Sequence, residues 1–353
     1  MHSDRPKPLH LICGRAIVMH VLHALDGLDL ERTVVVVGAD AERVTKKVHE
    51  QAPVWANVTF VEQAARHGSG DATLVGLSAF DSDDLDDTST VIVLPGDRPL
   101  LRPDTVARLV ERHESEGNAA TVLTVLRSDV DGQRRIVRVD QRKNDHHILR
   151  IAEANEPVTQ TGHTGPYECS TSIFAFRRDL LGPALRRLRP LGGPGIYALA
   201  DVIETLSTMG YRIGSVEVND ESEVAAVDDR WQLAMAEREL RARTNRDWLL
   251  RGVTMLDPRQ TFIDVTVELG RDITLFPGTM LQGRTIVGDG CEIGPNTRLV
   301  DCVVGSGAVV QNTVGSEAEI GAGAQVGPFA FLEQGSSVGE NARTGPFYTA
   351  SAE

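Results

Sequence analysis

The sequence predicts an α/β protein in which a doubly wound, Rossmann-like domain is followed by a parallel β-helix. Three observations support this fold class. Strands and helices alternate up to about residue 220, as in a mostly parallel sheet with helices on both faces. Beyond about residue 250, aliphatic residues recur with a period of six and are often followed by glycine, which is typical of hexapeptide repeats. With 353 residues, the chain is also too long for one core and fits two domains.

Composition and charge narrow the class of protein. Apolar residues make up 41% of the chain and charged residues 24%, as in ordinary soluble proteins. A net charge of -14 argues against a nucleic-acid partner. No apolar stretch reaches the length of a membrane span, so we expect a cytoplasmic protein without a membrane partner. The cysteines follow no paired spacing and are expected to be buried small apolar residues: Cys13, Cys169, Cys291 and Cys302.

A short apolar run at residues 91–94 is the expected central strand of the sheet. It is rich in β-branched residues and too short for a helix, so we expect it to be buried on both faces. Asp97 follows it, within Pro95-Gly96-Asp97. Ligands of open α/β sheets bind outside the carboxyl ends of the strands, and Mg²⁺ prefers carboxylate oxygen. Asp97 is therefore a predicted metal ligand, although Pro, Gly and Asp are also ordinary turn residues.

The remaining elements of the first domain are predicted from apolar runs and helical spacing. The expected strands are residues 33–38, 58–61, 120–126, 135–139, 171–176 and 212–218. The expected helices are residues 16–25, 104–116, 178–188 and 198–209. Between two of these elements, Gly68-Ser69-Gly70 opens a further helix and offers backbone N–H groups to an anion or to the edge of a base.

A helix over residues 227–250 is expected to connect the two domains, because it is rich in Ala, Leu, Arg and Glu. Residues 251–353 then form the β-helix, in which each repeat is one short strand and a turn. The aliphatic column that fills its core is predicted to be Leu269, Leu275, Leu281, Val287, Ile293 and Leu299, followed after a phase shift by Val314, Ile320, Val326, Leu332 and Val338.

Several motifs together resemble one known family. They are Ser3 to His10 for S-D-x-P-K-V-L-H, Gln63 with Gly68-Ser69-Gly70 for Q-x-x-x-x-G-T-G, Gly96-Asp97 with Pro99 for G-D-x-P, Ile151-Ala152-Glu153 for I-V-E, and Val224 to Arg230 for V-x-G-V-N-[ND]-R. The sequence resembles the bifunctional N-acetylglucosamine-1-phosphate uridylyltransferase/glucosamine-1-phosphate acetyltransferase family over almost its whole length. The resemblance implies a nucleotidyltransferase domain over residues 1–226 and a left-handed β-helix that trimerises.

The implied reaction is nucleotidyl transfer, in which a sugar 1-phosphate attacks the α-phosphorus of a nucleoside triphosphate and pyrophosphate leaves. By resemblance, Asp97 and Asp228 hold Mg²⁺ and Lys7 steadies the phosphates. Contacts to the base come from Gln63, Gly68 and Ser69. From the residues alone, two alternatives stay open: Lys7 as a solvated surface lysine, and Asp228 as the N-cap of the connector helix.

The expected sugar pocket departs from the family pattern. Arg134 stands where the family has the glycine of Y-G-R, and Ser170 replaces the asparagine of E-x-N-x-G, while Glu153 persists. Arginine cannot leave the space that glycine leaves, and serine lacks the two-ended amide of asparagine. Arg134, Glu153 and Ser170 are thus expected to bind an acceptor other than N-acetylglucosamine 1-phosphate. The sequence looks most like short homologues that activate a C7-cyclitol phosphate with GTP in antibiotic-type metabolism.

Both ends of the chain depart from the family as well. The family's L-A-A-G-x-G-T-R-M loop ends where Met1 stands, so we expect the true start to lie upstream. The β-helix stops at Glu353, before the family's acetyl-transfer histidine and lysine, and is therefore expected to serve in assembly. Three alternatives stay open: a UTP-dependent N-acetylglucosamine-1-phosphate uridylyltransferase, a non-catalytic oligomeric scaffold, and an acyltransferase.

Overall fold

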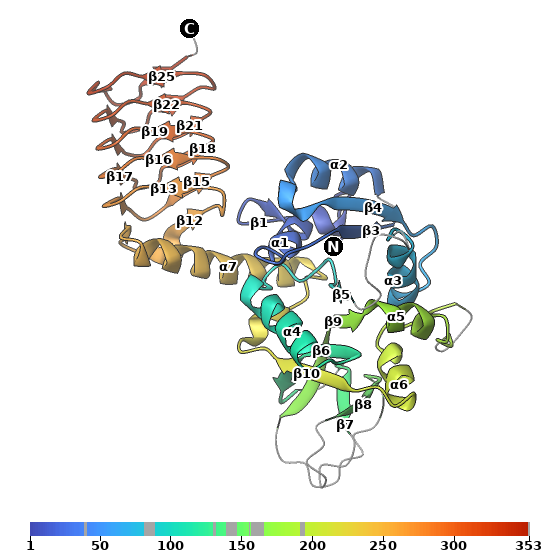
Figure 1. Ribbon diagram of the computed structural model, residues 1–353. Helices are drawn as coiled ribbons and strands as arrows, with labels where there is room; N and C mark the ends of the chain where they lie inside the picture. The colour runs from blue at the N-terminus through green and yellow to red at the C-terminus, as the bar shows by residue number, and fades with distance from the viewer. Residues whose placement is uncertain are drawn as a thin grey trace. The chain divides into compact units, whose positions relative to one another are not determined.

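The computed structural model confirms the predicted fold class and divides the chain into two compact units (Figure 1). It describes residues 1–38, 41–80, 89–129, 132–138, 147–154, 156, 166–190 and 195–351. The first unit comprises Met1–Leu9 and Ile17–Asp228, and the second comprises His10–Ala16 and Asp229–Glu353. Within the described ranges, no helix combines the length and the apolar character needed to cross a membrane.

The first unit contains two sheets. The larger sheet has the order β10-β6-β9-β7-β8, and β5 also pairs with β9. Its strands are β5 (Thr90–Val93), β6 (Ala120–Arg127), β7 (Arg135–Arg138), β8 (Ile148–Ala152), β9 (Tyr167–Arg177) and β10 (Ile213–Glu217). Residue 139, the expected end of β7, lies outside the described residues. The smaller sheet pairs β3 (Thr33–Val37) with β4 (Val58–Glu62) in parallel.

The expectation of mostly parallel pairing is wrong for the described strands of the larger sheet. In the larger sheet only β10 and β6 pair in parallel, whereas β9 runs antiparallel to β5, β6 and β7. The crossover through helix α4 (Pro103–Ser115) gives β5 and β6 the same direction. The two strands do not pair with each other, because β9 lies between them and runs the opposite way.

The predicted burial of the central strand is also wrong. All residues of β5 are half-buried, whereas the first six residues of β6 are fully buried. The difference follows from strand order. β6 has a partner on each side, β9 and β10, while β5 pairs with β9 alone among the described strands. The apolar run at residues 91–94 therefore identified a strand but not its position in the sheet.

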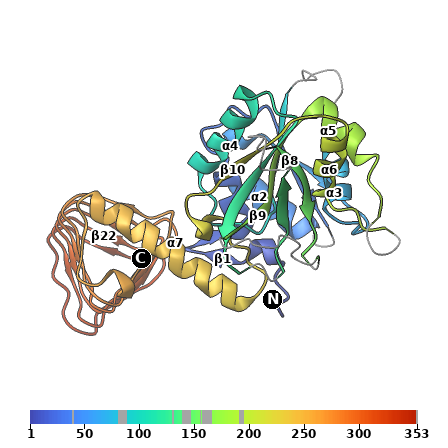
Figure 2. The same ribbon diagram turned by 90° about the horizontal axis from the view of Figure 1, so that it is seen from below.

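Helices cover both faces of the larger sheet, as Figure 2 shows. Besides α4, the α-helices described in the first unit are α1 (Ile17–His23), α2 (Ala41–Gln51), α3 (Ser69–Leu77), α5 (Arg178–Leu185) and α6 (Asp201–Thr208). Because successive residues of a strand point to opposite faces, Phe174 and Phe176 of β9 pack in the core beneath α5 and α6, whereas Ile173 packs in the core beneath α4. The sequence analysis missed α2, in which only Val44 and Val48 are buried.

The second unit begins with a hairpin of β1 (Leu11–Ile12) and β2 (Arg15–Ala16) and continues with helix α7 (Arg230–Leu250). The β-helix that follows has three parallel ladders, which Figure 2 views end-on. Their strands are β11 (Thr254–Met255), β12 (Thr261–Ile263), β13 (Glu268–Leu269), β14 (Thr274–Leu275), β15 (Thr279–Gln282), β16 (Ile286–Val287), β17 (Glu292–Ile293), β18 (Arg298–Val300), β19 (Val303–Val304), β20 (Val309–Val310), β21 (Val314–Ser316), β22 (Glu319–Ile320), β23 (Gln325–Val326), β24 (Phe331–Leu332), β25 (Ser337–Val338) and β26 (Thr349–Ala350).

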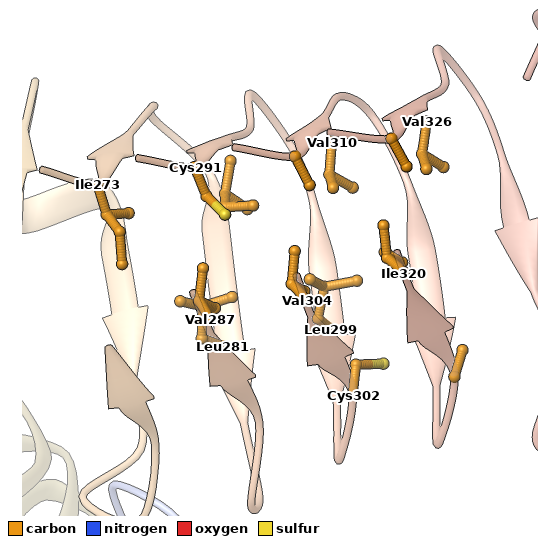
Figure 3. Packing of buried hydrophobic residues seen from close by; sticks show 14 of the residues in the cluster. Ile273, Leu281, Val287, Cys291, Leu299, Cys302, Val304, Val310, Ile320 and Val326 are labelled. Carbon is orange, nitrogen blue, oxygen red and sulfur yellow. The ribbon is translucent and has the colours of Figure 1, made fainter. Parts of the chain in front are cut away.

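The predicted aliphatic column does fill the core of the β-helix (Figure 3). The exceptions are Leu269, which is only partly buried, and Val314, which is 45% exposed. Gly315 takes the inward position beside Leu299 because the step from Val310 to Gly315 is five residues in place of six. As predicted, the four cysteines are free and buried, and two of them add to this core: Cys291 and Cys302.

Candidate active site

Lys7 lies between the two carboxylates that were predicted to bind metal. Its ammonium nitrogen is 2.8 Å from Asp97 Oδ2 and 2.5 Å from Asp228 Oδ1. Burial lowers the pKa of Lys7, but hydrogen bonds and attraction to Asp228 and Asp97 outweigh it, so the pKa is raised overall. The three side chains thus form one charged group just beyond the end of β5, and Lys7 is not a solvated surface lysine.

Contacts of Asp97 and Arg98 hold the segment that precedes Asp228. The N–H of Val227 donates to the carbonyl oxygen of Asp97 at 3.1 Å. The guanidinium of Arg98 donates to the carbonyl oxygen of Val224, and its Nε lies 3.7 Å from Asp97 Oδ1. Arg98 therefore fastens the segment before Asp228 to the turn after β5. Sequence analysis missed Arg98, although its place beside Asp97 was a signal.

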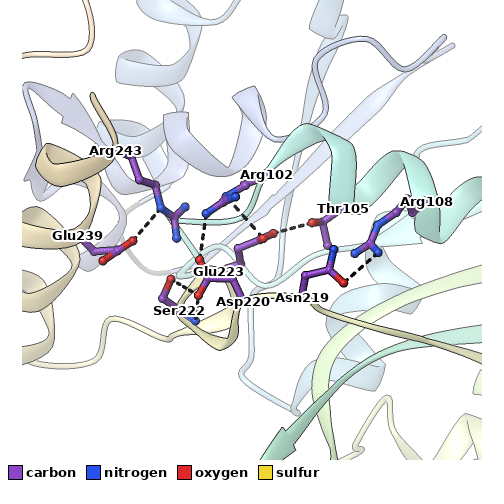
Figure 4. A network of polar contacts seen from close by, with 9 residues as sticks. All are labelled: Arg102, Thr105, Arg108, Asn219, Asp220, Ser222, Glu223, Glu239 and Arg243. Atoms are coloured by element: carbon purple, nitrogen blue, oxygen red, sulfur yellow. Dashed lines mark hydrogen bonds and ion pairs between the residues drawn. The ribbon is translucent and has the colours of Figure 1, made fainter. Parts of the chain in front are cut away.

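A polar network holds the same segment against the start of α4 (Figure 4). Arg102 Nη2 lies 2.9 Å from Asp220 Oδ2. The hydroxyl of Thr105 donates at 2.6 Å to Glu223, whose side chain is buried. A buried carboxylate must find donors, so this contact restricts the path of the short 3₁₀ helix Glu221–Val224. Contacts with the start of α4 therefore position the chain segment that leads to Asp228.

The alternative role of Asp228 as the N-cap of the connector helix is wrong. Asp229 is the N-cap of α7: its side chain accepts from the N–H of Gln232, and Gln232 bonds back in a capping box. The Asp228 carboxylate contacts Lys7, and its side chain is 64% exposed. The two neighbouring aspartates thus have different contacts: Asp228 pairs with Lys7, and Asp229 caps α7.

The Gly-rich turn requires glycine for steric reasons. Gly68 has φ +94°, and a Cβ there would lie 2.4 Å from the carbonyl oxygen of Tyr197. The same oxygen accepts from the N–H of Gly70 at 2.8 Å. Ser69 Oγ accepts from the N–H of Leu199 at 3.0 Å. The turn is therefore packed against the segment that precedes α6, which fixes the start of α3.

Gln63 belongs to this turn through its side chain. Its amide nitrogen donates to Asp71 Oδ2 at 2.6 Å and to the carbonyl oxygen of Gly68 at 3.4 Å. The predicted base-contacting residues Gln63, Gly68 and Ser69 are thus brought together. Asp71 was missed by the sequence analysis, although it is the first carboxylate after the glycines.

The three residues predicted for the acceptor also lie together. Arg134 Nη2 is 3.1 Å from Glu153 Oε1, and the N–H of Ser170 donates to the carbonyl oxygen of Arg134 at 2.8 Å. Asp201, which the sequence analysis missed, faces this pair. Burial raises the pKa of Asp201, the charge of Arg134 opposes that shift, and Glu153 adds to it. The group can offer both donors and acceptors to a polyhydroxylated ligand.

A separate cavity of about 760 Å³ opens on another part of the first unit. Its walls include the ion pair of Arg138 and Glu168, and none of the predicted site residues lines it. The predicted site residues therefore lie outside this cavity.

A doubly wound domain that has a lysine held by two carboxylates at a strand end, and a Gly-rich turn at the start of a helix, is typical of a nucleotidyltransferase. Residues 1–206 match the family described as the MobA-like NTP transferase domain. The chain belongs to this family and is a sugar-phosphate nucleotidyltransferase.

Curated relatives extend the similarity over the β-helix. The chain is 41% identical over 347 residues to the bifunctional protein GlmU of Streptomyces avermitilis, which covers 98% of this chain and 70% of that protein. It is 39% identical over 350 residues to the GlmU of Streptomyces coelicolor, with 99% and 70% covered. A solved structure of CMP:2-keto-3-deoxy-manno-octonic acid synthetase complexed with CTP matches 69% of this chain and 95% of its own, with a TM-score of 0.50 at 19% identity. That last similarity concerns the fold alone.

Proposed function

We propose that the protein transfers a nucleoside monophosphate from GTP to valienol 1-phosphate, giving an NDP-cyclitol and pyrophosphate, in antibiotic-type metabolism. The observation that carries the proposal of phosphate chemistry is the Lys7 ammonium held between Asp97 and Asp228. It concentrates a positive charge and two oxygen ligands at one point. The ammonium can donate to phosphate oxygens and the two carboxylates can hold a divalent cation, which suits phosphoryl transfer because most of the work of that reaction is positioning and charge neutralisation.

In the proposed reaction, an oxygen of the acceptor phosphate forms a bond to the α-phosphorus of the triphosphate. The bond between the α-phosphorus and its bridging oxygen to the β-phosphate breaks, and pyrophosphate leaves with that electron pair. A phosphate monoester is largely ionised at neutral pH, so no general base is needed. Lys7 steadies the phosphates by exchanging part of its contact with Asp97 and Asp228 for phosphate oxygens.

Asp97 and Asp228 fit a magnesium ion. Both offer carboxylate oxygen, and both converge on the place where the structure holds a cationic nitrogen. A site of two carboxylates suits Mg²⁺ because this ion keeps water and phosphate oxygens as its other ligands. When bound there, Mg²⁺ would neutralise charge on the phosphates. Arg98 keeps the carboxylate of Asp97 in place through its contacts to Asp97 and Val224.

The acceptor end is proposed to be formed by Arg134, Glu153 and Ser170. Arg134 stands where the family pattern that the sequence resembles has glycine, and its side chain pairs with Glu153, so an N-acetyl group would have less room. The remaining N–H groups of Arg134 and the hydroxyl of Ser170 suit the ring hydroxyls of a cyclitol. Gln63, Gly68 and Ser69 are proposed to contact the base.

We also propose that the β-helix joins three chains into a homotrimer and that the enzyme works in the cytoplasm. Outward-facing apolar side chains on its ladders support association. They include Ile286, Val303, Val314 and Phe331, each at least 44% exposed.

The test is pyrophosphate release by the purified full chain with Mg²⁺, the four ribonucleoside triphosphates and a panel of hexose, hexosamine and cyclitol 1-phosphates. We expect release with GTP and valienol 1-phosphate. Asp97→Ala should lower kcat by about 100-fold or more, because it removes a proposed ligand of Mg²⁺ that also holds Lys7 in place. Asp104→Ala, an exposed aspartate in the first turn of α4, should change kcat by less than about twofold.

Other outcomes separate the alternatives. Release with UTP and N-acetylglucosamine 1-phosphate would replace our substrate assignment by a uridylyltransferase, which the similarity to GlmU favours. Equal activity of Asp97→Ala and the unchanged protein would contradict the site. Absence of release from a folded oligomer with every pair of substrates would favour a scaffold.

A further inference from the structure

The contact between Gln63 and Asp71 fixes which way the Gln63 amide faces. The amide nitrogen donates to Asp71 Oδ2 at 2.6 Å and to the carbonyl oxygen of Gly68 at 3.4 Å. A carboxylate and a backbone carbonyl only accept hydrogen bonds, so the amide must turn its nitrogen toward them. Its oxygen, Oε1, has no hydrogen-bond partner among the described residues. Gln63 therefore presents an acceptor to a ligand and keeps its donors for the protein.

Asp71 supplies a second acceptor, on the side chain that accepts from the Gln63 amide. It lies in the first turn of α3, where its Oδ2 is used by Gln63. Its other oxygen, Oδ1, has no hydrogen-bond partner in the part of the chain that the structure describes. Both side chains are only half-buried. These two side chains thus offer two acceptor oxygens and no free donor, so any donors to a base would have to come from the backbone N–H groups of the Gly-rich turn.

The four nucleobases differ in how many donors they place side by side. Guanine has adjacent donors at N1 and at its 2-amino group. Uracil has a single N3–H between two carbonyl oxygens, and cytosine and adenine have one amino group each. Two acceptors match the donor pair of guanine, whereas uracil would place a carbonyl against an acceptor. A site that leaves polar groups unpaired rejects the wrong ligand strongly.

We propose that Asp71 is a positioning residue that holds Gln63 for guanine and so makes GTP the nucleotide substrate of this enzyme. The inference rests on the proposed function, in which Gln63 faces the base. It adds a residue that reads the base indirectly, through the orientation of a neighbouring amide, and directly, through its own second oxygen.

The test compares Asp71→Asn with the unchanged full chain. Asparagine keeps the size of the side chain, but it can accept from Gln63 only by presenting an amino group in place of Oδ1. We expect kcat/KM for GTP relative to UTP to fall by about 10-fold to 100-fold, mainly through KM. Calorimetric titration of GTP and of UTP, with Mg²⁺ present, should show the same change in relative affinity.

The matched control is Asp104→Asn, which removes the same charge from the first turn of another helix, α4. It should leave the GTP to UTP ratio unchanged. Gln63→Ala is a second variant that removes the oriented acceptor without altering α3, and it should lower the ratio as well. It keeps the proposal testable if Asp71→Asn does not fold, which circular dichroism would show.

The outcomes distinguish this inference from the proposed function. A protein that uses UTP as well as GTP, or an unchanged ratio in Asp71→Asn and Gln63→Ala, overturns the inference and leaves nucleotidyl transfer intact. Tighter binding of GTP than of UTP, lost in Asp71→Asn, supports the inference even if no acceptor yields pyrophosphate, a result that would count against the proposed function alone. Binding of neither nucleotide overturns both.

Discussion

Ser172 shows how one residue can keep a strained conformation next to a site. It has φ +64°, in the left-handed region that favours glycine, and its side chain is exposed. It lies where the pairing of β6 with β9 shifts register, so the extra residues of a β-bulge force this conformation. Its N–H bonds to Ser170 Oγ at 3.3 Å, which links the strain to a residue proposed to bind the acceptor.

Ser172→Gly is expected to stabilise the protein. The left-handed conformation costs a serine about 1–2 kcal/mol, and the added flexibility of glycine in the unfolded chain cancels about half of the gain. The free energy of unfolding should rise by about 0.5–1 kcal/mol, measured by urea denaturation. Ser115→Gly, at the exposed end of α4, should lower it by about 0.5 kcal/mol. A loss of stability in Ser172→Gly would show that the serine side chain is needed there.

His113 gives the protein a predicted pH dependence. Its ring is 2% exposed and its Nδ1 lies 3.0 Å from Thr121 Oγ1. Burial, with repulsion from Arg177, lowers the pKa of His113 to about 4. Between about pH 6.5 and pH 4 the unfolded chain therefore binds a proton that the folded chain does not. The neutral ring stabilises the fold above this range, and stability should fall as the pH falls through it.

The size of this effect can be measured by comparing variants. Between pH 7 and pH 4.5, His113 should account for up to about 3 kcal/mol of the decrease in the free energy of unfolding. His113→Asn should reduce the slope of stability against pH in that range, whatever its stability at pH 7. Equal slopes for the two proteins in urea denaturation would assign the pH dependence to other groups.

At the scale of an element, the two valines of β19 separate the faces of the β-helix. Val304 is 2% exposed and packs in the core, whereas Val303 beside it is 47% exposed. Val304→Ala should cost about 1.5–3 kcal/mol of unfolding free energy, because buried methyl groups are lost and a cavity is left. Val303→Ala should change it by less than about 0.5 kcal/mol. Similar costs for both would contradict the assigned register of the ladder.

At the scale of the whole molecule, the proposed trimer predicts a dependence on outward-facing residues. Val314 and Phe331 are partners in neighbouring strands of one ladder, and both are about half exposed. Replacing both by aspartate should place charges in the subunit interface and yield monomers, measured by sedimentation velocity. The doubly substituted chain should keep its β-helix, because neither side chain faces the core. An unchanged mass would place the interface elsewhere, and a monomeric unchanged protein would contradict the trimer.

The sequence predicted those features that depend on short stretches of chain. Hexapeptide spacing identified the β-helix and most of its core because each repeat adds one strand and one turn in the same register. The prediction failed at Val314. A turn that is one residue shorter places Gly315 inward and Val314 outward, and the spacing alone did not show which turn was shorter. An apolar run followed by a carboxylate was sufficient to place Asp97 just after a strand, whereas its role as a metal ligand stays a prediction.

The resemblance to a known family grouped distant residues, but only the tertiary structure showed the contacts through which they meet. Lys7, Asp97 and Asp228 come from three separate parts of the chain, and their convergence depends on strand order and on the contacts of Arg98, which no local pattern encodes. The antiparallel course of β9 beside β5 was likewise a long-range outcome. Even for Gln63 and Asp71, which are close in sequence, the tertiary structure was decisive, because the direction in which an amide faces is set by its partners in space.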